Sequence, residues 1–206
     1  MAVILLKEEA NYTLLVYKIE EGDNFYHSGI DFTEHDIQEY ENISNPLKKR
    51  QWLASRYWLK KISKQKRTLY IQKSELGKPH ITNHQAYFSI SHSKDTIAII
   101  YSLENEVAVD IEFIQNKIAK IKNKFLHPLE FKFEDNLQSL AIIWSAKESI
   151  YKYYHSRSLY SFKENIIVQS IEPSKVQYTL SNPSIQRSHS VFHLKIEEFI
   201  VTWISN

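Results

Sequence analysis

Two segments with helical periodicity constrain the fold of this chain more than any other feature. The first begins at Asn45 and Pro46, which suit an N-cap and the first helical position, and its apolar residues recur at mainly helical spacing to about Ile62. The second covers about residues 136–154, and a shorter helical segment covers about 116–126. The fold therefore has to accommodate one long helix in each half of the sequence.

Runs rich in strand-forming residues surround these helices. They cover about residues 2–6, 12–17, 69–81, 87–91, 96–102 and 107–111 in the first half, and 165–172, 175–181 and 189–203 in the second. Residues 76–80 contain Gly and Pro and indicate a turn, while residues 103–106 are short enough to join two strands as an antiparallel hairpin. This order permits two similar α+β halves that meet near residue 105.

The composition favours a compact chain in a reducing compartment. Of 206 residues, 43% are hydrophobic, and only 3 Gly and 5 Pro leave little room for flexible linkers. The absence of Cys excludes disulfides, thiolate metal ligands and a cysteine nucleophile, so we expect a cytoplasmic location.

Membranes and nucleic acids are not expected partners. No stretch reaches the roughly 20 apolar residues of a membrane-spanning helix, and residues 1–9 resemble a first strand more than a signal peptide. The formal net charge of +2 is too small to indicate nucleic-acid binding, although Lys and Arg are dense between Lys48 and Arg67.

Asp110 and Glu112 end an apolar run and are separated by one residue. In a strand, both carboxylates therefore point to the same face. A hard divalent cation such as Mg²⁺ is a natural partner for two such groups, because it takes oxygen ligands and shares them with substrate phosphates. An ordinary solvated strand end is the alternative, and it is the commoner origin of a lone Asp-x-Glu.

Lys147 and Glu148 fall inside the apolar arc of the second long helix. Burying either charge without a counter-charge or a metal ion would be expensive, so this face of the helix indicates a site. A structural Lys-Glu network is the alternative, and Glu148 with Lys152 also makes an ordinary i,i+4 pair.

Ser91 and His92 end a strand at a polar turn and could donate hydrogen bonds to a phosphate. Neighbouring strand residues point to opposite faces, which argues against a Ser-His catalytic dyad. The nine histidines show no zinc-binding spacing, and the sequence has neither a GxxxxGK[ST] loop nor a GxGxxG motif. Bound phosphates would thus depend on side chains, and the available cations are Arg50, Arg56, Lys78, Lys147 and Lys152.

Taken in order, several segments resemble the 4'-phosphopantetheinyl transferase superfamily, in particular its surfactin-type, single-chain, pseudo-dimeric branch. The matching segments are RQWLASR at residues 50–56, GKPH at 77–80, FSISHS at 88–93, VAVDIE at 107–112 and WSAKESIYK at 144–152, which is similar to the signature WxxKExxxK. The resemblance covers roughly residues 45–170.

The resemblance implies an α+β fold and a transferase activity. It implies two tandem subdomains, residues 1–104 and 105–206, related by pseudo-two-fold symmetry, each a small, mainly antiparallel sheet packed on a long helix. The reaction would be that of a holo-[acyl-carrier-protein] synthase type enzyme, which moves phosphopantetheine from coenzyme A to a serine of an apo acyl or peptidyl carrier protein. A monomer is expected, because both halves already lie in one chain.

The resemblance also implies roles for individual residues. Asp110, Glu112 and Glu148 would surround Mg²⁺, and Glu148 would be the general base for the incoming serine hydroxyl. Lys152 would meet the pyrophosphate, which makes Asp110, Glu148 and Lys152 the catalytic set. Glu130 matches an acidic position near the active site. Coenzyme A would be held in the N-terminal subdomain by Arg50, Arg56, Lys78, Pro79, Ser91 and His92, with Lys147 and Lys152 from the C-terminal one.

Two positions depart from the family pattern. Ala108 stands where the family usually has Gly before the VDIE strand, and the usual Gly after the KE helix is absent from the region of residues 155–157. Two alternative functions fit the same residues. One is a module that binds coenzyme A or a carrier protein without transfer, and the other is a Mg²⁺-dependent phosphohydrolase.

Overall fold

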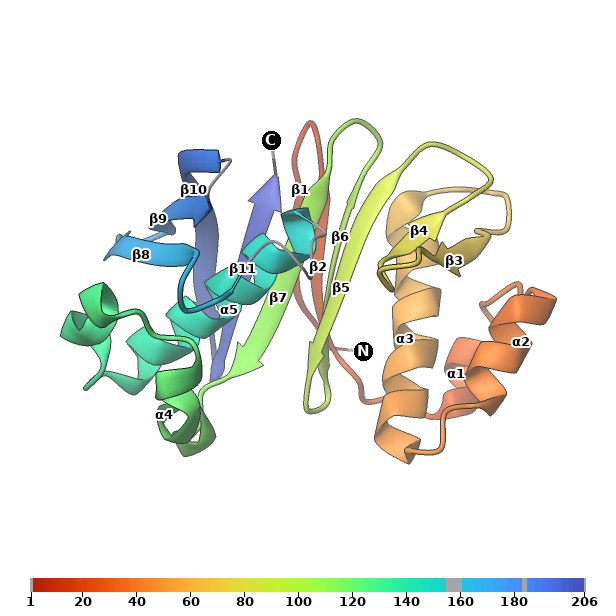
Figure 1. Ribbon diagram of the computed structural model, residues 1–206. Helices are drawn as coiled ribbons and strands as arrows, with labels where there is room; N and C mark the ends of the chain where they lie inside the picture. The colour runs from red at the N-terminus through yellow and green to blue at the C-terminus, as the bar shows by residue number, and fades with distance from the viewer. Residues whose placement is uncertain (1, 155–160, 183–184, 206) are drawn as a thin grey trace. The chain divides into compact units, whose positions relative to one another are not determined.

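The chain forms two compact units, which we describe separately. The computed structural model describes residues 2–154, 161–182 and 185–205 (Figure 1). Unit 1 comprises residues 1–107 with 205–206, and unit 2 comprises residues 108–204.

The core of unit 1 lies on a four-stranded antiparallel sheet. Its strands are ordered β1-β2-β6-β5, with bounds β1 Ala2–Glu8, β2 Thr13–Lys18, β6 Thr96–Ser102 and β5 Tyr87–Ser93. The sequence TIAIIYS of β6 is buried along its whole length, and this strand pairs with β2 on one edge and with β5 on the other. Lys94, in the short turn between β5 and β6, adopts a left-handed conformation with φ of 53°.

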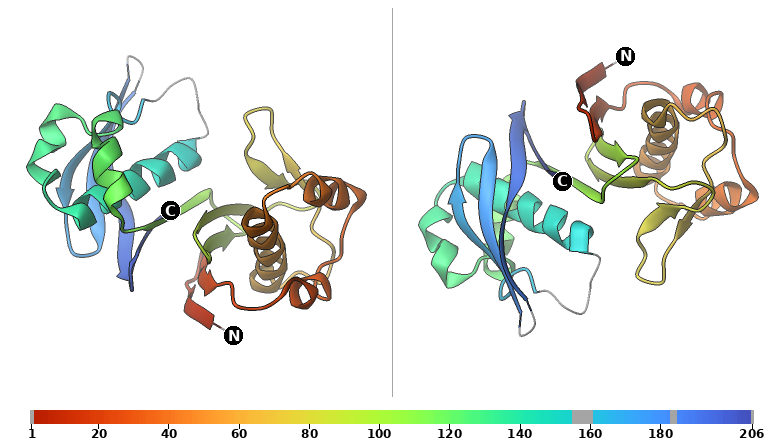
Figure 2. Two further views of the ribbon diagram at one scale, coloured as in Figure 1. Left: turned by 90° about the horizontal axis from the view of Figure 1, so that it is seen from below. Right: turned by 90° about the horizontal axis from the view of Figure 1, so that it is seen from above.

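Helix α3, Pro46–Ser63, packs on this sheet (Figures 1 and 2). The Asn45 side chain accepts a hydrogen bond from the Lys48 backbone N–H at 3.0 Å, so the predicted N-cap is confirmed. Leu53 and Leu59 of α3 are fully buried in the same hydrophobic cluster as Ile97 and Ile99 of β6. This apolar contact fixes the orientation of α3 and leaves its other side for polar residues.

Smaller elements complete unit 1. The helices α1, Asp23–His27, and α2, Glu34–Glu41, precede α3, and the strands β3, Ile71–Lys73, and β4, Pro79–Ile81, form a two-stranded antiparallel sheet. Gly29, just after α1, lies against the Tyr57 ring of α3, where an added Cβ would come within 2.4 Å of a ring carbon. This position therefore requires glycine for the close approach of the two segments.

Unit 2 contains a five-stranded sheet in the order β7-β11-β10-β9-β8. Helix α5, Leu137–Tyr154, lies along one face of this sheet (Figure 2). Its apolar residues join the cluster that fills the unit, which includes Leu140, Ile143, Val176 and Ile200. The remaining bounds are β7 Val107–Phe113, α4 Asn116–Ile121, the 3-10 helices η1 Lys122–Lys124 and η2 Pro128–Phe133, β8 Ile166–Ile171, β9 Lys175–Asn182, β10 Ile185–Ile196 and β11 Phe199–Ser205.

The observed sheets correct two expectations. Strands β6 and β7 belong to different sheets, so the predicted hairpin at residues 103–106 is wrong. The predicted strand at 189–203 is two strands, β10 and β11, which turn at Glu197 with φ of 51° and pair antiparallel. The α+β class with antiparallel sheets is confirmed, and among the described residues we find no helix long and apolar enough to cross a membrane.

Candidate active site

Strand β7 and helix α5 bring Asp110 and Lys152 together in unit 2. The Lys152 Nζ donates to Asp110 Oδ1 at 2.8 Å and to the Val109 carbonyl at 3.1 Å. Asp110 is buried, with only 5% of its surface exposed, whereas Lys152 is partly exposed, so the carboxylate side of the ion pair is shielded from water. Alternation along β7 gives Glu112 the same face as Asp110, and the helical repeat gives Glu148 the same face as Lys152.

Glu148 and Glu112 are electrostatically coupled to Asp110. Burial, together with the charges of Asp110 and Glu112, raises the pKa of Glu148 to about 7, against the opposing effect of Lys152. Burial and the charge of Asp110 also raise the pKa of Glu112 above its ordinary value. The three carboxylates therefore repel one another, and the charges of Lys152 and Lys117 only partly offset this repulsion.

The three carboxylates fit a hard divalent cation by their chemistry. Carboxylate oxygens are preferred Mg²⁺ ligands, and a cation would relieve the repulsion that raises the two pKa values. Among the described residues, a set of three ligand atoms within 4.8 Å of one another occurs elsewhere, at His35, Asp36 and Glu39 in unit 1. Arg56 already forms ion pairs with Asp36 and Glu39, which disfavours a second cation there.

Glu148 gives a pH dependence of stability that can be measured without substrate. Because its pKa is raised in the folded protein, the folded state holds this proton more tightly than the unfolded state, and stability is lost as pH rises from about 4.5 towards about 7. In the presence of a chelator, we expect Glu148→Gln to be more stable than wild type at pH 8. The difference in the free energy of unfolding between the variant and wild type should be about 2 kcal/mol larger at pH 8 than at pH 5. Urea unfolding at both pH values measures this difference. The exposed Glu164→Gln serves as the control, and an equal gain at both pH values would contradict the prediction.

Lys147 lies next to Glu148 in sequence but occupies the core of unit 2. Its side chain is fully buried, and its Nζ donates to Glu130 Oε2 at 2.7 Å, to the Phe125 carbonyl at 2.7 Å and to the Phe162 carbonyl at 2.8 Å. Burial lowers the pKa of Lys147, and the Glu130 carboxylate opposes this shift. All three ammonium protons therefore have acceptors inside the protein.

Glu130 completes this network from the other side. It is also fully buried, and it accepts from the backbone N–H of His127 at 2.7 Å and of Val168 at 2.6 Å. The Lys147–Glu130 pair thus connects α5 to η2, to β8 and to the loop at Phe162. This geometry favours a structural role for both residues over the contact with coenzyme A predicted for Lys147.

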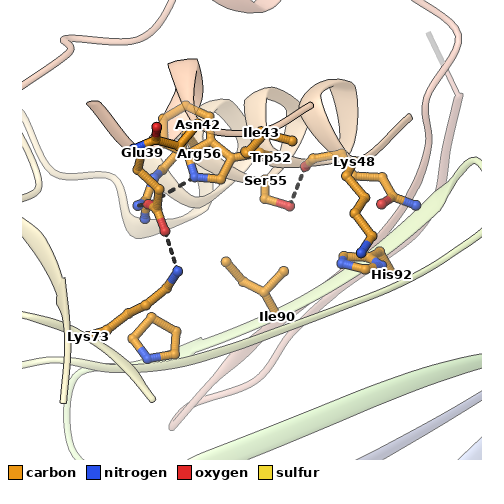
Figure 3. A pocket seen from close by; sticks show the side chains of 12 residues that line it. Glu39, Asn42, Ile43, Lys48, Trp52, Ser55, Arg56, Lys73, Ile90 and His92 are labelled. Carbon is orange, nitrogen blue, oxygen red and sulfur yellow. Dashed lines mark hydrogen bonds and ion pairs between the residues drawn. The ribbon is translucent and has the colours of Figure 1, made fainter. Parts of the chain in front are cut away.

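Unit 1 contains a cavity of about 520 Å³ (Figure 3). Lys48, Lys73 and His92 extend toward the same space, with Glu39 and Trp52 on the side of α2 and α3. The full lining comprises Glu39, Asn42, Ile43, Lys48, Gln51, Trp52, Ser55, Arg56, Lys73, Pro79, Ile90 and His92. Cations and aromatic or apolar groups in one cavity suit a ligand that has both phosphate and base.

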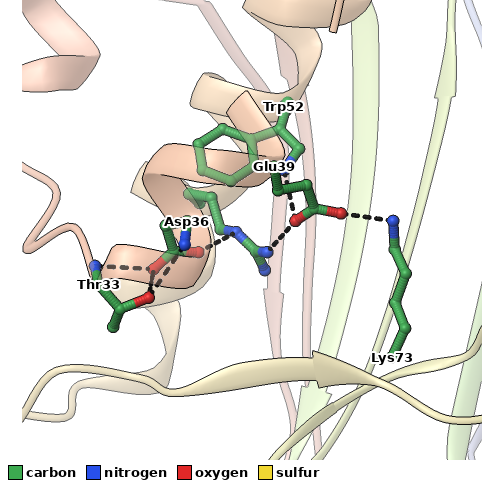
Figure 4. Close-up of polar contacts among 6 residues, drawn as sticks. Thr33, Asp36, Glu39, Trp52 and Lys73 are labelled. Carbon is green, nitrogen blue, oxygen red and sulfur yellow. Dashed lines mark hydrogen bonds and ion pairs between the residues drawn. The ribbon is translucent and has the colours of Figure 1, made fainter. Parts of the chain in front are cut away.

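Arg56, which lines this cavity, forms ion pairs with Asp36 and Glu39. Figure 4 shows the polar contacts around these two carboxylates. Arg56 Nε lies 3.2 Å from Asp36 Oδ1, and its Nη2 donates to Glu39 Oε2 at 2.8 Å. The Trp52 indole N–H also donates to Glu39 Oε2, at 3.0 Å, and Lys73 pairs with the other oxygen, Oε1. Although burial raises the pKa of Glu39, these contacts outweigh it, and the pKa lies below its ordinary value.

The residues predicted to hold coenzyme A are distributed unevenly in unit 1. Arg56, Pro79 and His92 line the cavity. Arg50, in contrast, pairs with Asp23 at 3.0 Å on the exposed side of α3, and Lys78 pairs with Glu106 at 2.8 Å. Ser91 is buried within β5.

The sequence prediction missed three charged residues of the cavity lining: Lys48, Lys73 and Glu39. Lys48 lies eight positions before Arg56, close to two helical turns, so helix periodicity could have placed both on one face. No comparable local signal links Lys73 or Glu39 to the cavity. Of the two departures from the family pattern, Ala108 is buried in β7, and residues 155–157 lie outside the described residues.

Comparisons with known proteins find one family. Residues 106–204 match the model described as "4'-phosphopantetheinyl transferase superfamily". The chain is 34% identical over 116 residues to the "4'-phosphopantetheinyl transferase AcpT" of Salmonella typhimurium, an alignment that covers 52% of this chain and 59% of that protein. It is 31% identical over 93 residues to the "Putative 4'-phosphopantetheinyl transferase" of Haemophilus influenzae, which covers 40% of this chain and 39% of that protein. The chain therefore matches less than two thirds of the length of either relative.

Proposed function

We propose that this chain, whose residues 106–204 match the 4'-phosphopantetheinyl transferase superfamily, transfers phosphopantetheine from coenzyme A to a serine of an apo carrier protein. The observation that carries the proposal is the cluster of Asp110, Glu112, Glu148 and Lys152, which lies within the matched segment. The names of the two relatives support the same reaction class.

Each residue of this cluster has a role in the proposed reaction. Asp110, Glu112 and Glu148 would hold Mg²⁺, which, when bound, neutralises charge on the pyrophosphate. Lys152, whose Nζ lies 2.8 Å from Asp110, adds positive charge for the same pyrophosphate. Glu148, which shares a face of α5 with Lys152, is the proposed acceptor of the proton of the serine hydroxyl.

The proposed step is a direct displacement without a covalent enzyme intermediate. The serine oxygen of the carrier attacks the β-phosphorus of coenzyme A, and its proton passes to Glu148. The bond from that phosphorus to the bridging oxygen breaks, and adenosine 3',5'-bisphosphate leaves. The reaction requires positioning and charge neutralisation, which the cluster supplies from rigid elements.

The cavity of unit 1 is the proposed place for the nucleotide part of coenzyme A. Arg56, Lys48, Lys73 and His92 offer positive or hydrogen-bonding groups for phosphates, and Trp52 and Ile90 offer apolar surface for a base. Arg56 and His92 were expected there from the sequence, whereas Lys147 has its partners in the core of unit 2.

Intact-mass spectrometry of apo carrier proteins tests the function directly. Incubation of the full chain with coenzyme A, Mg²⁺ and a panel of carriers should add the mass of one phosphopantetheine to at least one carrier. The gain should disappear when the metal is chelated and with Glu148→Ala, while the exposed Glu164→Ala should leave it unchanged.

Other outcomes of this experiment favour the alternative functions. Coenzyme A binding without a mass gain on any carrier would indicate a binding module. Release of adenosine 3',5'-bisphosphate from coenzyme A without a carrier would indicate a phosphohydrolase.

A further inference from the structure

The cavity of unit 1 already contains an internal anion. Glu39 from α2 contacts Arg56, Lys73 and the Trp52 indole N–H, which are donors that a bound phosphate would also use. Only 16% of the Glu39 side chain is exposed, so this carboxylate occupies the wall of the cavity and does not extend into solvent.

We infer that Glu39 acts as a built-in competitor for the phosphate of the ligand, which has to displace its carboxylate from Arg56 and Lys73 in order to bind. The inference rests on the proposed function in one respect, since it takes that phosphate to belong to the nucleotide part of coenzyme A. It goes beyond that function in assigning a regulatory residue to the cavity.

The chemistry of the contacts supports an exchange between the two anions. A guanidinium group binds carboxylate and phosphate oxygens with the same N–H donors, and it forms comparable charge-assisted hydrogen bonds with each. A phosphate that approached while Glu39 remained in place would meet a carboxylate of like charge within hydrogen-bond distance of the same donors. The phosphate of the ligand therefore either displaces Glu39 from these donors or binds with lower affinity while Glu39 remains in place.

The attachment of α2 allows Glu39 to leave. Asp36 is the one buried residue of this eight-residue helix, and its contacts to α3 are largely polar or aromatic. The capping box between Thr33 and Asp36 holds the first turn, and Asp36 keeps its own ion pair with Arg56. Glu39 lies nearly one turn beyond Asp36, so its side chain can change rotamer while the first turn stays anchored.

Binding of adenosine 3',5'-bisphosphate, measured by isothermal titration calorimetry, tests the inference. Glu39→Gln keeps the size of the side chain and removes its charge, and we expect it to bind this probe about tenfold more tightly than wild type. Inorganic phosphate as a second probe should show the same direction of change. Glu41→Gln is the matched control, because it removes one carboxylate from the exposed side of the same helix, and it should change the affinity less than twofold.

Weaker or unchanged binding by a folded Glu39→Gln would overturn the inference and would make Glu39 a brace that aligns Arg56. Absence of binding of both probes to both proteins would overturn it as well. Thermal unfolding establishes whether the variant is folded.

A second measurement uses the wild-type protein and does not depend on the variant. The ¹H–¹⁵N resonance of the Trp52 indole, assigned with Trp52→Phe, reports the hydrogen bond to Glu39. We expect it to shift when inorganic phosphate binds, because that hydrogen bond is lost and phosphate has no base that could shift the resonance by stacking on Trp52. Saturation with inorganic phosphate without any shift would mean that Glu39 stays in place, which contradicts the inference.

These results are separable from those on the transferase reaction. Tighter probe binding by Glu39→Gln without phosphopantetheine transfer by the wild type would support the internal competitor and reject the proposed function. Transfer by the wild type, with no effect of Glu39→Gln on probe binding, would support the proposed function and reject the internal competitor.

Discussion

Lys147→Met is expected to lower the free energy of unfolding by about 3 to 5 kcal/mol, because it leaves the carboxylate of Glu130 buried without its counter-charge. Both side chains of the pair are fully buried, and their oxygen and nitrogen lie 2.7 Å apart. The substitution also leaves the carbonyls of Phe125 and Phe162 without their donor. Urea unfolding followed by circular dichroism measures the loss.

Lys152→Met is the matched control for this prediction. It makes the same change on the same helix, but 27% of the Lys152 side chain is exposed, so water can compensate part of the lost ion pair. We expect its loss of stability to be about 1 kcal/mol. The double substitution Lys147→Met with Glu130→Met should recover part of the loss, because no unpaired charge then remains. Equal losses for Lys147→Met and Lys152→Met would show that burial of the first pair does not determine its contribution.

Asp110→Asn is expected to reduce the rate of the proposed phosphopantetheine transfer at saturating substrates by about a thousandfold. Asparagine has nearly the same size but carries no charge, so the variant removes one proposed metal ligand and the partner of Lys152. Intact-mass measurements over time give the rate, and the binding of Mn²⁺ in place of Mg²⁺, followed by electron paramagnetic resonance, gives a second readout.

Glu164→Gln is the control for the Asp110 substitution. It removes an exposed carboxylate from unit 2 and should leave both the rate and the Mn²⁺ affinity within about twofold of wild type. An Asp110→Asn protein that transfers at the wild-type rate would exclude this carboxylate from the reaction. A normal Mn²⁺ affinity with a reduced rate would instead limit its role to the placement of Lys152.

Local signals explain which parts of the fold were predictable. The N-cap at Asn45 and the apolar periodicity of α3 depend on residues close in sequence, and both are confirmed. The hairpin at residues 103–106 failed because loop length alone does not choose a partner, and β6 already pairs with β2 and β5. Helix α2 could not be predicted from apolar periodicity, because its sequence contains only one aliphatic residue, Ile37. This residue is exposed, and the helix is attached mostly through polar contacts.

In the candidate sites, too, only the features that depend on residues close in sequence were predictable. Strand alternation indicated that Asp110 and Glu112 share a face, and the helical wheel indicated that charged residues of α5 lie on its apolar side. The partners of these charges could not be derived from spacing, because Lys152 meets Asp110 across 42 positions and Lys147 meets Glu130 across 17. The wheel placed Lys147 and Glu148 together, whereas the fold separates them into a core network and an acidic cluster.

The buried pair of Lys147 and Glu130 also limits how sequences of this fold can diverge. A chain that replaces one partner has to pass through a state with an unpaired buried charge before it can replace the other. The requirement to fold alone therefore accounts for the lysine of the WxxKExxxK motif in this chain, whether or not the chain transfers anything. Glu148 is different, because a carboxylate whose pKa is raised to about 7 costs stability at neutral pH. Folding stability alone therefore does not account for a glutamate at this position, whereas a function of its carboxylate would.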